Sequence, residues 1–175
     1  MKRWVALGLL VAMTLLPACW PAAALALHAA GRAPAMGWAT VAGTGYRIGV
    51  PEGWSVTVQP DPAQAVLEAT NADGSQTMLA FVQEQPGWDL VRWQKALEKA
   101  SRSNSVSDIA ELWIGERCFI GYALAWEGIA AWAAATQVSE GLFVTLEFRV
   151  QLPGEPRADF IPSPDCFLAT MQVEP

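Results

Sequence analysis

The sequence predicts an α+β fold, in which a mostly antiparallel β-sheet of about six or seven strands is covered by two helices. Short runs of alternating apolar and polar residues recur beyond residue 45, separated by Gly, Pro, Asn and Asp turn signals. Segment 89–102 instead has an apolar stripe at helical spacing, and a short C-terminal helix is expected at 163–171. An all-β barrel or sandwich with one flanking helix is the alternative.

The first strand signal is the stretch 46–50, which runs into a Pro-Glu-Gly-Trp corner. Pro51 has no N–H to donate to a sheet, so strand pairing should stop there. Gly53 allows a backbone bend that a side chain would resist. We therefore expect the chain to turn at this corner and Trp54 to fold back onto the core.

The next strand signals form hairpins. Segments 65–70 and 76–83 flank the turn sequence Asn-Ala-Asp-Gly-Ser. A β-meander follows, with strands expected at 111–115, 117–126, 129–138 and 142–151. In its last strand the alternation places Thr145 and Glu147 on an outward face. The two middle strands are apolar on both faces and need cover on both sides.

The expected helix 89–102 is amphipathic. Asp89 is a candidate N-cap, and Leu90, Trp93 and Leu97 share one stripe with Ala100. The opposite stripe is basic and consists of Arg92, Lys95, Lys99 and Arg102. This stripe is a candidate face for anionic lipid headgroups or an acidic partner. The alternative is an ordinary solvated helix face. The sequence Ser-Pro-Asp at 163–165 predicts the start of the second helix.

The N-terminus has the layout of a secretory signal. Lys2 and Arg3 precede an apolar run that is too short to span a bilayer, and small residues follow it. We expect residues 1–26 to be a signal peptide and the protein to be exported to the periplasm. Alternatively, the sequence Leu-Pro-Ala-Cys resembles a lipobox, so the signal would end at residue 18 and Cys19 would be lipidated and attach the protein to the membrane. Residues 27–42 are expected to be an Ala/Pro/Gly-rich tail or tether, and residues 43–175 a single globular domain.

The cysteine count predicts a disulfide. If Cys19 is discarded with the signal or consumed by lipid, two cysteines remain in an oxidising compartment, Cys118 and Cys166. A bond between them would attach the C-terminal helix to a strand of the meander. The alternative is two free thiols that act as small apolar residues.

Composition and residue types argue against several classes of function. Without the signal, nine Lys and Arg face seventeen Asp and Glu, which argues against a nucleic-acid partner. The single histidine, His28, precedes the domain, so a histidine-dependent catalytic unit is not expected there. Metal-ligand spacings and phosphate-binding loops are not apparent. We therefore expect no catalytic residues, no metal and no cofactor.

The order of elements and the motif Tyr-Arg-Ile-Gly-Val-Pro-Glu-Gly-Trp, residues 46–54, suggest a family. An exported chain with this motif, a hairpin, one amphipathic helix, a meander and a short C-terminal helix resembles the PsbP-like α/β/α sandwich domains, and among them the DcrB-like bacterial periplasmic lipoproteins. The resemblance covers residues 46–171. It implies a non-enzymatic envelope adaptor or assembly module of unknown partner. A carrier for a small apolar or lipid-like ligand, with an internal cavity of several hundred Å³, is the alternative.

Overall fold

The fold is that of a computed structural model, which describes residues 37–174 except 44, 60–65, 103–104, 127 and 152. The predicted signal peptide and Cys19 lie outside these residues. The strands are β1 (Trp38–Gly43), β2 (Tyr46–Pro51), β3 (Ser55–Val58), β4 (Leu67–Thr70), β5 (Gln76–Glu84), β6 (Val106–Ile114), β7 (Arg117–Trp126), β8 (Ile129–Ser139), β9 (Leu142–Val150) and β10 (Gln172–Val173). The helices are α3 (Leu90–Ser101), α4 (Pro156–Asp159) and α5 (Pro164–Thr170).

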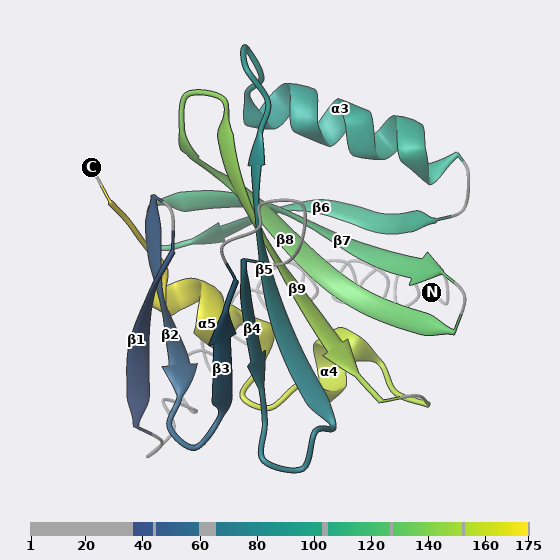
Figure 1. The fold of residues 1–175 in the computed structure, drawn as a ribbon. Coiled ribbons are helices and arrows are strands. Elements are labelled where there is room, and N and C mark those ends of the chain that lie inside the picture. The colour runs from purple at the N-terminus through teal and green to yellow at the C-terminus, as the bar shows by residue number, and fades with distance from the viewer. Residues whose placement is uncertain are drawn as a thin grey trace, which may run out of the picture. The chain divides into compact units, whose positions relative to one another are not determined.

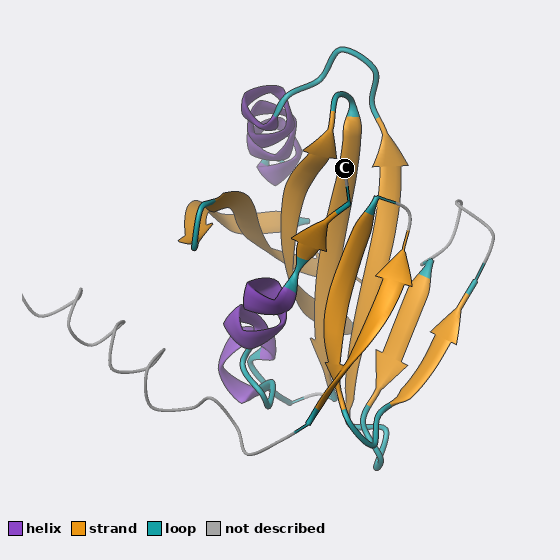
Figure 2. Ribbon diagram, turned by 90° about the vertical axis from the view of Figure 1, so that its left-hand side faces the viewer, coloured by secondary structure: helices purple, strands orange, loops and turns teal. Residues whose placement is uncertain are grey.

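The strands form two antiparallel sheets, which confirms the predicted α+β class (Figure 1). Seven strands form the large sheet in the order β3-β4-β5-β9-β8-β7-β6, and β1, β2 and β10 form the small one. The large sheet is strongly twisted. Strands β6 and β7 run between α3 on one side and α5 on the other, as a view turned by 90° also shows (Figure 2). None of the described helices is long and apolar enough to cross a membrane.

Glycines with positive φ close the predicted hairpins. Gly115, Gly128 and Gly141 have φ of 61°, 78° and 67°, a region that side chains other than hydrogen disfavour. Gly53, with φ of 87°, makes the predicted bend between β2 and β3. The ring of Trp54 then lies on the core as expected, at 5.7 Å from Phe160 and 5.6 Å from Phe167 between centroids.

The large sheet separates two apolar clusters. The main cluster lies between it, the small sheet and α5, and is filled by aromatic rings that meet edge to face or at a tilt. These rings are Trp38, Trp54, Phe148, Phe160 and Phe167. The second cluster lies on the other face, beneath α3, and contains Trp93, Ile120, Tyr122 and Phe143. The middle strands β7 and β8 are thus covered on both faces, as their sequence requires.

Several boundaries differ from the sequence prediction. The expected tail 27–42 includes most of β1, which pairs along the whole of β2. Strand β6 begins at Val106 and not at residue 111 as expected. Strand β10 and helix α4 were not predicted from the sequence. The outward assignment of Thr145 and Glu147 is wrong, because these residues are only 5% and 6% exposed.

Candidate functional site

Helix α3 is fixed to the sheet at its N-terminal half. The carboxylate of Asp89 accepts a hydrogen bond from the amide of Arg92 at 2.8 Å, which confirms the predicted N-cap. Trp93 is 8% exposed and stacks on Phe143 of β9, with 4.7 Å between ring centroids and 21° between planes. Leu90 and Leu97 are half-buried beside it. The apolar stripe therefore faces the sheet, and the opposite side of α3 faces solvent.

The predicted basic stripe occupies that solvent side. All four cations are exposed, and at 100° per residue they fall within an arc of about 80°. They are Arg92, Lys95, Lys99 and Arg102, and we call them the α3 basic face. Arg92 is partly engaged, since its guanidinium donates to the carbonyl of Gly87 at 2.7 Å and lies over the ring of Trp88. Within the described residues, none of the four forms an ion pair.

Cations elsewhere in the fold are mostly neutralised. Of the eleven Lys and Arg residues, three precede the fold, and four of the remaining eight belong to the α3 basic face. Three others form ion pairs with carboxylates. These pairs are Arg47–Glu174 at 2.5 Å, Arg149–Glu147 at 2.5 Å and Arg157–Asp165 at 3.8 Å. The α3 basic face is therefore an uncompensated positive patch on a chain whose net charge is −6.

An open cleft of about 730 Å³ lies between the start of α3 and α5, where β7 and β8 separate. The pairing of these strands ends at Ile120 and Ala135, and the hydroxyl of Thr136 donates to the carbonyl of Cys118 at 2.8 Å. The lining is mixed in character. It comprises Leu90, Ile114, Glu116, Arg117, Cys118, Thr136, Gln137, Val138, Ser139, Leu168, Ala169 and Met171. The cleft is therefore open and of mixed polarity, and is not an enclosed apolar chamber.

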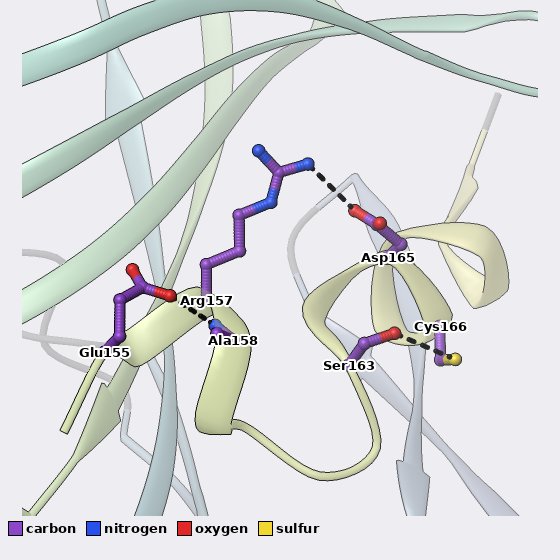
Figure 3. A network of polar contacts seen from close by, with 6 residues as sticks. All are labelled: Glu155, Arg157, Ala158, Ser163, Asp165 and Cys166. Atoms are coloured by element: carbon purple, nitrogen blue, oxygen red, sulfur yellow. Dashed lines mark hydrogen bonds and ion pairs between the residues drawn. The ribbon is translucent and has the colours of Figure 1, made fainter. Parts of the chain in front are cut away.

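The structure does not contain the predicted disulfide, because Cys118 and Cys166 are both free. Helix α5 does reach the cleft that Cys118 lines, but through Leu168 and Ala169. Cys166 is not among the residues that line this cleft. Its sulfur instead lies 3.5 Å from the hydroxyl of Ser163, at the start of the same helix (Figure 3). Ser163 occupies the N-cap position as predicted, yet its hydroxyl does not cap the helix.

Figure 3 also shows how α4 and α5 are joined. The carboxylate of Glu155 caps α4 by accepting from the amide of Ala158, and Arg157 of α4 reaches Asp165 of α5. The guanidinium of Arg157 also lies over the ring of Trp132 in the large sheet, at 4.7 Å from its centroid. These contacts are structural, since they hold the two C-terminal helices against the main cluster.

A buried polar group that the sequence analysis missed lies on the α3 side of the large sheet. Glu147 is 6% exposed, and the guanidinium of Arg149 binds it and lies over Trp126. Tyr122 on β7 is also buried there, and burial raises the pKa of its phenol to about 12. A hydrogen bond with Thr145 lowers this pKa, and the charge of Glu147 raises it. The salt bridge with Arg149 compensates the charge of Glu147, so we interpret this pair as a structural part of the core and not as a binding site. Alternation alone could not have found it, because both faces of β9 are covered.

Among the described residues, no group of three or more His, Cys, Asp or Glu side chains is placed to hold a metal ion. No protein-family model matches the chain, and no match was found among curated proteins.

Proposed function

We propose that this protein is an exported, non-enzymatic protein of the cell envelope that acts as an adaptor or assembly module and docks through the α3 basic face. The observation that carries the proposal is that these four cations are exposed and have no carboxylate partner in the part of the chain that the structure describes, on an acidic chain. A positive patch of this kind attracts a negatively charged partner over several ångströms and orients it.

Two further observations support this function. The main cluster is filled by interlocking aromatic rings, as suits a rigid scaffold rather than a carrier with an apolar chamber. The signal-like N-terminus and the resemblance of residues 46–171 to PsbP-like domains support an envelope location and a non-enzymatic role.

Co-purification from envelope extracts tests the docking role. The variant Lys95→Glu/Lys99→Glu should lose the proteins or membrane fragments that the wild-type chain retains, because it reverses the charge of the face. The matched control Arg47→Glu/Arg117→Glu makes the same change in net charge at cations outside α3. Equal retention by all three proteins would contradict the proposal.

Mass spectrometry of the mature protein tests export and anchoring. We expect the first 18 to 26 residues to be absent. A diacylglyceryl group on Cys19 would identify the lipoprotein route, and an N-terminus near residue 27 would identify ordinary cleavage. An intact Met1 on cytoplasmic protein would contradict export.

A carrier function is the second candidate, and the cleft is the observation that favours it, since about 730 Å³ is within the range of small-molecule sites. Solvent extraction of the purified chain followed by mass spectrometry should then release a stoichiometric apolar compound. Ala169→Trp, which places a large ring at the exposed rim of the cleft, should reduce its yield. A chain that yields no compound would exclude this function.

A further inference from the structure

We infer that the partner of the α3 basic face is the anionic surface of a membrane, an inference that rests on the docking role proposed above. The four cations project from one side of a single helix. From Arg92 to Arg102 there are ten residue steps, which is about 15 Å along the axis at 1.5 Å per step. A patch of this length and sign matches a layer of anionic lipid headgroups, which offers negative charge at many positions without a fixed geometry.

The surroundings of the face favour lipid over an acidic protein. Specific protein interfaces centre on anchor side chains that fill shaped pockets. The cleft near the start of α3 is lined by Leu90 but by none of the four cations. Lys95, Lys99 and Arg102 make no hydrogen bond to the described residues that would fix their direction. Long cationic side chains without fixed partners can follow a headgroup layer, whereas a specific protein contact would have to order them.

One apolar side chain continues the same arc. Val91 is 57% exposed and lies beside Arg102 and Lys95 on the helical wheel. An exposed apolar side chain beside the cations adds apolar contact with the interface of a bilayer, although the main apolar stripe of α3 is occupied by the sheet. The nearest acid on the helix, Glu98, lies at the flank of the arc, where its carboxylate accepts from the amide of Gln94 at 3.2 Å. No acid interrupts the arc itself.

The expected binding is weak for the face by itself. Each cation close to an anionic surface contributes about fivefold to the partition constant, so the three unengaged cations contribute about 100-fold together. This is the strength of an auxiliary contact. A lipid on Cys19 would supply the other attachment, since two weak signals combine into stable anchoring.

Vesicle sedimentation of the full chain tests the inference. Vesicles of phosphatidylcholine with phosphatidylglycerol should bind the wild-type chain more strongly than vesicles of phosphatidylcholine alone, and added salt should remove the difference. Lys95→Gln/Lys99→Gln/Arg102→Gln should weaken binding to the anionic vesicles about 100-fold, at about fivefold per cation. The apolar residues 1–26 are the same in every variant, so any binding through them cancels from the comparison.

The matched control is Arg47→Gln/Arg117→Gln/Arg157→Gln, which removes three cations from other elements. It should weaken binding to anionic vesicles less than about fivefold, the effect of one surface cation. If the two triple variants lose binding equally, net charge and not the α3 face is responsible, and the inference fails. If the α3 variant binds anionic vesicles like the wild type but loses an envelope protein on co-purification, the docking role stands and the lipid inference is wrong. Circular dichroism of both variants verifies that they fold.

Discussion

Replacing Trp93 by alanine should separate α3 from the sheet more than any change on its outer side. The indole is 8% exposed, stacks on Phe143 and contacts Trp88 edge to face at 6.4 Å between centroids. Truncating a buried tryptophan costs about 3–5 kcal/mol in the free energy of unfolding, and the lost aromatic contacts place this site in the upper half of that range. Leu97→Ala should cost about 1–2 kcal/mol, less than a fully buried leucine, since Leu97 is half-buried.

Phenylalanine at the same position should behave differently. Within the described residues, the buried indole N–H of Trp93 has no hydrogen-bond partner. An unpaired buried donor costs about 1–3 kcal/mol. Trp93→Phe removes that donor and keeps the stack on Phe143, while it loses part of the ring packing. The two effects oppose each other, so we expect a change within about 1 kcal/mol of the wild type.

Urea unfolding followed by far-ultraviolet circular dichroism measures these differences, provided that the dependence on urea is the same in all variants. Lys95→Glu/Lys99→Glu is the control on the outer side of the helix and should change stability by less than about 0.5 kcal/mol. If Trp93→Ala cost less than about 1 kcal/mol, or less than this charge reversal, the assignment of the buried side of α3 would be refuted.

Three further changes test other parts of the fold. Burial raises the pKa of Tyr46 and Tyr122 to about 12, so both phenols ionise at lower pH in the unfolded chain than in the folded one. The free energy of unfolding should therefore fall as pH rises from about 10 to about 12. Replacing both tyrosines by Phe should remove this part of the decline. Burial and the charge of Glu111 raise the pKa of the Cys118 thiol. Glu111→Gln should therefore increase the thiolate fraction at neutral pH and speed the reaction of Cys118 with a thiol reagent. An unchanged rate would show that the charge of Glu111 has no effect on this thiol. A methyl group at Gly49 would lie 2.9 Å from the side chain of Thr170, the last residue of α5. Gly49→Ala should therefore lower the free energy of unfolding by about 1–3 kcal/mol, measured by urea unfolding. An unchanged free energy of unfolding would mean that α5 can shift to make room for the methyl group.

The sequence predicted the meander closely because its signals are local. Glycine and polar residues mark each turn, and β7 occupies 117–126 as expected. Helix α3 was also predicted well, since Asp89 as N-cap and Trp93 on the apolar stripe define its start and its buried side. In both cases the residues that decide the structure lie within a few positions of one another.

The errors occur where distant segments decide. Strand β1 has an Ala- and Gly-rich sequence that resembles a tail, and it is a strand because its residues pair with β2. Glu147 follows the polar positions of an alternating strand, yet it is buried because α3 and its neighbours cover that side of the sheet. The disulfide prediction rested on number and compartment, and these do not determine which way Cys166 points on α5. The basic face could be predicted, since helical spacing places its members together, but its lack of ion pairs could not.

The two ends of the domain meet in one core, and this affects the order in which the chain can fold. Strand β2 pairs with β10, and the amide of Gly49 donates to the hydroxyl of Thr170 across 121 residues. Rings from β1 and from α5 share the main cluster, with Trp38 and Phe167 at 5.2 Å. Contacts so far apart in sequence form slowly, since a long loop must close before they contribute. A nascent chain therefore cannot complete this core before α5 and β10 have been synthesised, so the strands made first must wait for the last two elements of the domain.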